Sequence, residues 1–213
     1  MKEDYGLIKI FGPSIFKVKI PDDLVNNLNK FIDNVIENEE QSKRLDVGRG
    51  LVGDVKQEFR LDRKITEESG WLRFLGNCVK EWIYQDTGKK MSEFKLIETW
   101  VVRQFENEYN PVHIHTGCRL SCVGYLSLPE GIEDEWEEDY KDHHPSNGHI
   151  QFLSGTSSGY TSTNFMVKPQ VGDFYVFPNQ LFHCVYPFKT KGERRSFSVN
   201  MNFVEVPKDK KDA

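Results

Sequence analysis

The chain has 213 residues, a length that suits one domain or one domain with an appended subdomain. Its 28 lysines and arginines against 33 aspartates and glutamates give a formal net charge of -5, and basic residues gather only in a short tail at residues 208–211. That balance argues against a nucleic-acid partner, which needs a surface that neutralises phosphates. No apolar run approaches the roughly 18 residues that cross a bilayer, so we expect a soluble protein with no membrane partner.

The cysteines are few and spread along the chain, at positions Cys78, Cys118, Cys122 and Cys184. In the absence of a charged-then-apolar stretch at the N-terminus, they argue against a secreted disulfide scaffold and favour reduced thiols in the cytoplasm. Their spacing, with Cys184 beside His183, also suggests a zinc site. Strand parity disfavours that site, because Cys184 and His183 point to opposite faces of a regular strand, and we interpret the cysteines as packed thiols.

The N-terminal part begins with alternating apolar and polar residues, which predict short strands over residues 7–11 and 15–20 around the turn at Gly12-Pro13. A helix is expected to start near Pro21 and to end in the polar run of residues 37–44. Its apolar stripe at helical spacing consists of Leu24, Leu28, Phe31, Ile32, Val35 and Ile36.

A second helix is predicted after a glycine-rich loop over residues 47–53. Thr66 is its expected N-cap, and Thr87-Gly88 should end it. Trp71 and Trp82 lie on its apolar side and, with Trp100, are interpreted as core residues. We expect the two helices to cover one face of a sheet.

Beyond residue 95 the sequence is a succession of short strands separated by turn signals, with no helix between them. They are predicted over residues 95–105, 120–128, 149–152, 164–167, 173–177, 183–187 and 195–203. This pattern indicates a mainly β (α+β) fold with an antiparallel sandwich or jelly-roll barrel. We predict a single domain, residues 1–213, in which residues 1–95 form a cap and residues 96–205 form the catalytic core.

An acidic insertion at residues 130–147 interrupts the strand pattern, with eight carboxylates and one lysine before residue 143. We favour a solvated loop, in which His143 and His144 are exposed. The alternative is a mobile lid at the mouth of the barrel, whose acidic rim over residues 133–142 would suit a cationic or basic peptide substrate.

The motif His113-Ile114-His115 carries the strongest chemical signal in the chain. Residues two apart on a strand point to the same side, so both imidazoles can bind one metal ion. Such a pair is weak evidence by itself. His183, on a later strand just past a turn, supplies a third imidazole, although a hydrogen-bonded core histidine would look the same in sequence.

Arg194 follows His183 by eleven residues and begins a strand with one polar and one apolar face. Strand parity places Arg194, Ser196, Ser198 and Asn200 on the polar face, which should point into the barrel. A buried arginine needs an anionic partner, and the carboxylate of a bound small molecule satisfies it in a bidentate manner. The alternatives are a protein carboxylate as partner, or a bulge that turns Arg195 inward.

Several short motifs recur in a fixed order between residues 98 and 203. They are Glu98-Thr99-Trp100, Tyr109-Asn110-Pro111, His113-Ile114-His115, the residues 120–126, Val171-Gly172-Asp173, Phe177-Pro178, the residues 183–187 and Arg194-Arg195-Ser196. In order and spacing they resemble the 2-oxoglutarate- and Fe(II)-dependent oxygenases, whose core is a double-stranded β-helix. The narrower likeness is to a subgroup from marine bacteria and phages.

This resemblance implies a role for each matching residue. His113 and His183 become iron ligands, and His115 takes the position where most members have an aspartate or glutamate. Arg194 becomes the partner of the distal carboxylate of 2-oxoglutarate, assisted by Ser196. Tyr125 falls where prolyl-hydroxylase-like members place a tyrosine that binds the same carboxylate, and Asn110 and Asn200 are further pocket residues.

The expected activity is therefore hydroxylation of an unidentified small-molecule or peptide substrate, with Fe(II), 2-oxoglutarate and O₂ as cofactor and co-substrates. Three histidines also suit Zn²⁺ with an open water position, so a zinc or other metal enzyme on a cupin-like barrel is one alternative. A non-catalytic jelly-roll binding module is another. The sequence leaves open the substrate, the pathway and whether the chain forms a homodimer.

Overall fold

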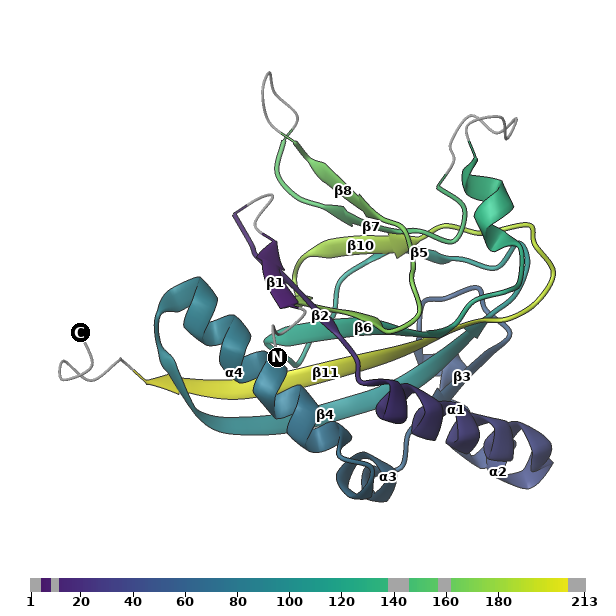
Figure 1. Ribbon diagram of the computed structural model, residues 1–213, viewed down its shortest axis with the longest axis horizontal. Helices are drawn as coiled ribbons and strands as arrows, with labels where there is room; N and C mark the ends of the chain where they lie inside the picture. The colour runs from purple at the N-terminus through teal and green to yellow at the C-terminus, as the bar shows by residue number, and fades with distance from the viewer. Residues whose placement is uncertain (1–4, 9–11, 138–145, 157–161, 207–213) are drawn as a thin grey trace.

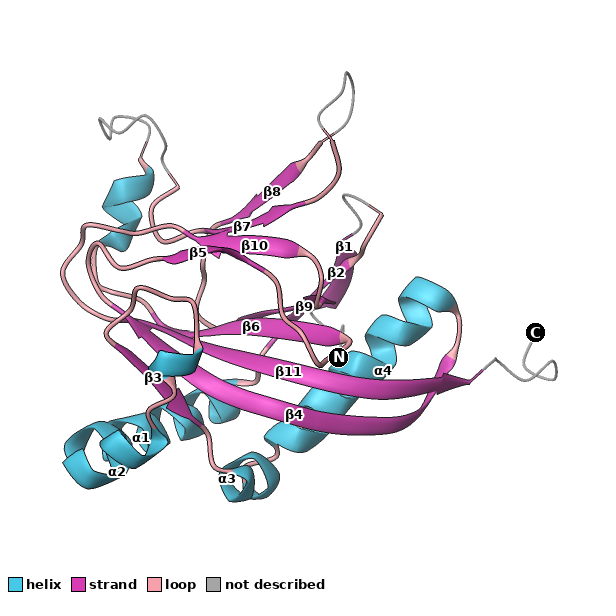
Figure 2. Cartoon of the chain, turned by 180° about the vertical axis from the view of Figure 1, so that it is seen from behind, coloured by secondary structure: helices cyan, strands magenta, loops and turns pink. Residues whose placement is uncertain are grey.

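The computed structural model describes residues 5–8, 12–137, 146–156 and 162–206. Two antiparallel sheets face each other, and the long helices lie on the outer side of the larger sheet (Figures 1 and 2). The predicted jelly-roll with helices on one sheet is confirmed.

The larger sheet has seven strands in the order β1-β2-β9-β6-β11-β4-β3, and the smaller sheet has four in the order β5-β10-β7-β8. In the larger sheet the strands are β1 (Tyr5–Ile8), β2 (Ile15–Lys19), β3 (Gln57–Arg60), β4 (Lys90–Gln104), β6 (Leu120–Ser127), β9 (Asp173–Pro178) and β11 (Arg194–Val206). In the smaller sheet they are β5 (Asn110–His113), β7 (Ile150–Leu153), β8 (Asn164–Val167) and β10 (Phe182–Val185).

Two long helices, α1 (Asp22–Glu37) and α4 (Trp71–Thr87), cover the outer face of the larger sheet, and the short helices are α2 (Glu39–Leu45), α3 (Arg63–Glu68), η1 (Gly48–Gly50) and η2 (Ile132–Trp136). Their apolar stripes pack on outward residues of β11, including Phe197, Val199 and Met201. The parity predicted for this strand is thus correct on its apolar face. A second apolar cluster, which includes Tyr125 and Phe152, fills the space between the sheets.

One local prediction for the N-terminal part, the start of the second helix, is wrong. Thr66 is not an N-cap: it lies inside α3, where its hydroxyl donates to the Asp62 carbonyl, and Asp62 itself caps that helix. The break comes at Gly70, which adopts a left-handed backbone before α4 begins. The predicted end of the first helix is correct, because α1 ends at Glu37, where the polar run begins. Asn38 then caps a separate short helix, α2, within that run.

Two short strands are absent from the predicted strand ranges, although the metal-pair hypothesis for His113-Ile114-His115 assumes an extended segment at the second of them. The sequence of β3, Gln57-Glu58-Phe59-Arg60, has a single apolar residue and so lacks the alternation that predicts a strand. It nevertheless forms the edge of the larger sheet beside β4. β5 contains Pro111 and lies at the edge of the smaller sheet beside β10, where a strand tolerates proline.

The described part of the acidic insertion is more ordered than a solvated loop. In η2, Ile132 and Glu135 are buried, and the Glu135 carboxylate accepts hydrogen bonds from the backbone of Lys189 and Thr190 and from the Asn147 amide. The insertion is therefore anchored to the segment that leads into β11. The lid interpretation concerns residues 138–145, including His143 and His144, which lie outside the described residues.

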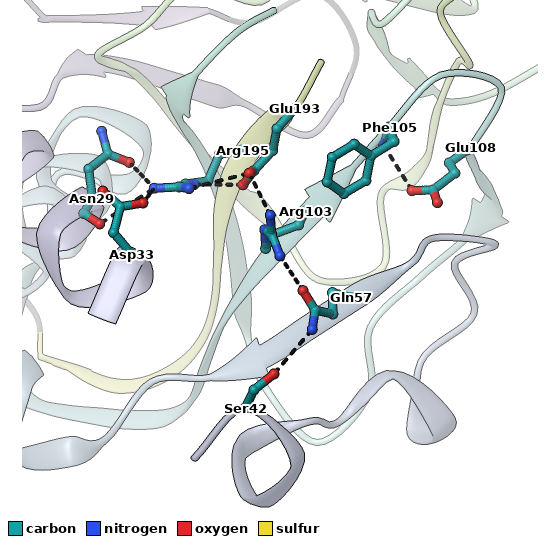
Figure 3. Close-up of polar contacts among 9 residues, drawn as sticks. All are labelled: Asn29, Asp33, Ser42, Gln57, Arg103, Phe105, Glu108, Glu193 and Arg195. Atoms are coloured by element: carbon teal, nitrogen blue, oxygen red, sulfur yellow. Dashed lines mark hydrogen bonds and ion pairs between the residues drawn. The ribbon is translucent and has the colours of Figure 1, made fainter. Parts of the chain in front are cut away.

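A polar chain ties the helices to the edge of the larger sheet (Figure 3). Arg195 binds Asp33 and Asn29 of α1 on one side and Glu193 on the other. Glu193 also binds Arg103 of β4. Arg103 in turn donates to Gln57 of β3, and Gln57 donates to Ser42 of α2.

Within the described residues, none of the helices is long and apolar enough to cross a membrane.

Candidate metal centre

Three imidazoles meet between the two sheets. His113 ends β5, His183 lies directly opposite on β10, and His115 follows two residues after His113. One nitrogen from each ring can be chosen so that all lie within 4.8 Å of one another, and His115 Nε2 is 3.3 Å from His183 Nε2. The structure therefore brings together the three histidines that the sequence singled out, with a spacing that one metal ion can span.

Backbone carbonyls orient two of the rings. His113 Nδ1 lies 2.7 Å from the Pro111 carbonyl and His183 Nδ1 lies 2.9 Å from the Leu181 carbonyl. A donated proton at Nδ1 leaves the lone pair on Nε2 free for a metal, which is a common arrangement of metal-binding histidines.

Burial keeps the three imidazoles neutral. Burial lowers the pKa of His113. It also lowers the pKa of His115 to about 4 and that of His183 to about 3, and for both of these the nearby His113 adds to the effect. Neutral imidazole is the form that binds divalent metals. The site therefore needs no deprotonation at neutral pH before it can bind one.

His115 reaches the site by a different route from the one expected. It lies beyond the end of β5, so regular strand parity does not place it. Asn179 holds this residue instead, because the His115 N–H donates to the Asn179 carbonyl and the Asn179 amide donates to the His115 carbonyl. The ring also packs at 5.7 Å from that of Trp100.

Arg194 is fully buried behind this centre, at the start of β11. Its Nη1 donates to Gln104 Oε1 at 3.1 Å and lies 3.4 Å from Ser196 Oγ, and the guanidinium packs over the Tyr125 ring at 4.9 Å. Among the described residues, no carboxylate forms an ion pair with it. Arg195 points outward, so the bulge at this point of the sheet does not exchange the two arginines.

The described residues around Arg194 leave some of its hydrogen-bonding groups without a partner. Its Nε and Nη2 atoms and the Tyr125 hydroxyl are buried without a hydrogen-bond partner among the described residues. Burial lowers the pKa of Arg194 and raises that of Tyr125. A buried cation with two free donors costs free energy that a bound carboxylate would recover. The residues present thus fit both a divalent metal and a carboxylate ligand.

A cavity of about 270 Å³ lies against the three histidines. The three histidines, Ser196, Ser198 and Asn200 line it, as the polar-face prediction for β11 requires. Asn110 lines it as well. Arg194 and Tyr125 do not line it, but Arg194 contacts Ser196, which does, and packs over the Tyr125 ring. The individual roles of these residues toward a co-substrate stay predictions.

Sequence reasoning missed three residues that belong to this site. Gln104 holds Arg194, and Asn179 holds His115. Gln104 was recoverable, since it shares its strand face with Trp100 and Val102. Glu58 is a buried carboxylate in the cavity wall, and it was missed because its strand, β3, was not predicted.

The cysteines and tryptophans have the predicted environments. All four cysteines are free and buried, and Cys122 lies on the helix side of β6, away from Tyr125. Trp71 and Trp82 pack in the core under the helices. Trp100 is also buried, but it lines the cavity.

Comparison with known proteins agrees with this arrangement. A family model described as "Putative 2OG-Fe(II) oxygenase" matches residues 98–200, which contain the three histidines, Arg194 and Ser196. The chain belongs to the 2-oxoglutarate- and Fe(II)-dependent oxygenases. Oxygenases of this class use Fe(II), 2-oxoglutarate and O₂, and the three-histidine site fits the iron.

Solved structures show the oxygenase fold at low sequence identity. A prolyl-4-hydroxylase from Pseudomonas putida is 16% identical, with a TM-score of 0.56 over 94% of this chain and 92% of that one. The viral collagen prolyl hydroxylase of Paramecium bursaria Chlorella virus-1, solved with 2-oxoglutarate, is 13% identical, with a TM-score of 0.51 over 94% and 96%. The epimerase SnoN from nogalamycin biosynthesis is 15% identical, with a TM-score of 0.56 over 94% and 78%. A search of curated proteins found no match.

Proposed function

We propose that this oxygenase is a hydroxylase in which His113, His115 and His183 hold Fe(II) and Arg194 anchors 2-oxoglutarate. The reaction would convert 2-oxoglutarate and O₂ to succinate and CO₂ and would place one oxygen atom in a C–H bond of the substrate. Two observations carry the proposal: three neutral imidazoles line one cavity, and a buried guanidinium with no carboxylate partner among the described residues contacts Ser196 in the wall of that cavity.

The chain's own residues supply position and exclusion of water. Iron, when bound, supplies the O₂ chemistry. Gln104 and Ser196 fix the guanidinium of Arg194, and its free nitrogens offer donors to the distal carboxylate. Tyr125, which lies beside Arg194, would donate a hydrogen bond from its hydroxyl to the same group. The apolar cluster between the sheets excludes water behind the site.

His115 replaces the usual carboxylate of the facial triad. An imidazole makes the site more positive by one charge, which would strengthen the attraction for the dianionic 2-oxoglutarate. Because the imidazole fills the position, this site differs from halogenating variants, in which a small residue leaves room for chloride.

The decisive experiment is an anaerobic titration of the purified protein with Fe(II), in the absence and presence of 2-oxoglutarate. We expect a visible metal-to-ligand charge-transfer band only when both are present. An iron-loaded protein that shows no band would contradict the proposal. Tight Zn²⁺ binding together with no band would favour the zinc alternative instead.

Two variants test the iron ligands in the same assay. His183→Ala should abolish iron binding, because it removes the most buried of the three imidazoles. His115→Asp should retain iron, because it restores the commoner triad of two histidines and a carboxylate. Loss of iron in both variants would show that the site tolerates only imidazole at position 115.

The location and partners follow as further proposals. Four free, buried thiols support a reducing compartment, and we propose the cytoplasm. The membership of a marine bacterial and phage subgroup, the absence of a nucleic-acid or membrane partner, and the homodimer stay predictions.

A further inference from the structure

A buried carboxylate faces the same cavity as the histidines and has no partner in the described part of the chain. Glu58 lies on β3 opposite Val102 of β4, and the residue is only 2% exposed. Its Oε2 atom is buried without a hydrogen bond, and no side-chain hydrogen bond or ion pair to Glu58 occurs among the described residues. An unpaired buried carboxylate is costly, so its position in the cavity wall calls for a ligand group that satisfies it.

A second unpartnered acceptor lines this cavity. Asn110 Oδ1, at the start of β5, is buried and accepts no hydrogen bond. The loop that contains Gly53 packs directly on it, since a Cβ atom at Gly53 would lie 2.1 Å from this oxygen. Backbone hydrogen bonds between Asp54 and Tyr109 fasten the same loop to the segment before β5. Both acceptors are thus held in place and lack only donors.

The charged groups described near Glu58 are negative, and none of the described residues supplies it with a cation. Glu98 also lines the cavity, but Arg60 already pairs with it at 2.7 Å. Asp46 is close enough to add to the effect of burial, and together they raise the pKa of Glu58 to about 7. A ligand that carries a positive charge and N–H donors would relieve both the repulsion and the missing hydrogen bonds.

The rest of this wall is apolar. Leu51, Val52, Trp100 and Val102 line the cavity beside Glu58. A cavity of about 270 Å³ is small for a ligand pocket, so it admits a side-chain-sized group rather than a bulky ring system. An aliphatic stem that ends in a cation matches this combination of surfaces.

We propose that Glu58 and Asn110 bind the cationic nitrogen of the substrate, a protonated amine or guanidinium on an aliphatic stem such as that of a lysine or arginine side chain. This inference rests on the proposed function, because it takes the cavity as the oxygenase active site. It assigns Glu58 to substrate selection and leaves the iron and 2-oxoglutarate contacts to the residues described above.

The test measures binding rather than turnover. Anaerobic protein loaded with Fe(II) and 2-oxoglutarate is titrated calorimetrically with Nα-acetyl-lysine methylamide and Nα-acetyl-arginine methylamide. The norleucine and citrulline analogues serve as neutral counterparts. We expect at least one cationic probe to bind at least tenfold more tightly than its neutral counterpart. Equal binding, or no binding of either cationic probe at millimolar concentration, would overturn the inference.

Variants assign the preference to Glu58. Glu58→Gln keeps the shape but removes the charge, and it should erase the preference for the cation. Glu93→Gln, an equal change of charge at an exposed position of β4 outside the cavity, should keep it. A Glu58→Gln protein that still prefers the cation would also overturn the inference.

The two proposals fail separately. The charge-transfer band is recorded on each loaded sample before the probe is added. A normal band without cation preference contradicts only the substrate assignment, whereas an absent band contradicts the proposed function. We expect the band to be unchanged in Glu58→Gln.

Discussion

Two adjacent arginines on β11 show how strongly position decides the role of a residue. Arg194 is buried toward the cavity with two free donor nitrogens, whereas Arg195 points toward α1 and is paired with Glu193 and Asp33. The same side chain therefore serves ligand binding at one position and packing of the fold at the next.

Exchanging each arginine for alanine should separate these roles. Arg194→Ala should weaken 2-oxoglutarate binding by about 2–5 kcal/mol, which is roughly 30-fold or more, because a buried charged hydrogen-bond partner is lost. Iron binding should persist. Arg195→Ala is the matched control, and it should lower stability while 2-oxoglutarate affinity stays the same. Anaerobic titration that follows the charge-transfer band measures the affinity, and equal losses in both variants would contradict the assignment.

At the scale of elements, the loop before β3 packs closely against the start of β5, where Gly53 contacts Asn110. A methyl group at Gly53 would lie 2.1 Å from Asn110 Oδ1 and 3.2 Å from Asn110 Cγ, so one of the two segments would have to move. This close approach fixes the wall of the cavity that carries Glu58.

Gly53→Ala should therefore destabilise the fold by about 1–3 kcal/mol, as overpacking does elsewhere. Adding Asn110→Ala removes the clashing amide, so the double variant should be more stable than the sum of the single changes predicts. Denaturant unfolding of the four proteins in this cycle measures the coupling. Additive effects would mean that the two residues do not meet in solution.

At the scale of the whole molecule, the sequence predicted what periodicity encodes. The stripe of α1, the end of α4 at Gly88 and the two faces of β11 follow from spacings of 3.6 and 2, and all are present. The site was foreseen because its histidines and Arg194 lie in motifs of fixed order. Two features could not be predicted from local sequence patterns, because they depend on partners distant in sequence: the pairing of β3 with β4, and the hydrogen bonds between Asn179 and His115. Glu58 was hidden for the same reason.

The polar chain of Figure 3 joins α1 and α2 through residues of β11, β4 and β3, and its central carboxylate is Glu193. Burial alone would raise the pKa of Glu193, but Arg103 and Arg195 outweigh it and hold this pKa below its ordinary value of 4.5. A carboxyl with a lowered pKa in the folded state adds stability above its unfolded pKa and loses it as the pH falls through the folded one. Glu193→Gln should thus cost about 1–3 kcal/mol at pH 7, because two largely buried guanidinium groups lose their shared anion.

This deficit should begin to shrink as the pH drops below 4.5, where the unfolded wild-type chain takes up a proton at Glu193, and should be gone below the lowered pKa of the folded state, where the folded carboxyl is also neutral. Denaturant unfolding at a series of pH values measures it, with Glu93→Gln as a control that should track the wild type throughout because that carboxylate is exposed. A deficit that stayed constant into acid would mean that Glu193 acts through its shape rather than its charge. The helical layer would then be held mainly by the apolar stripes of α1 and α4.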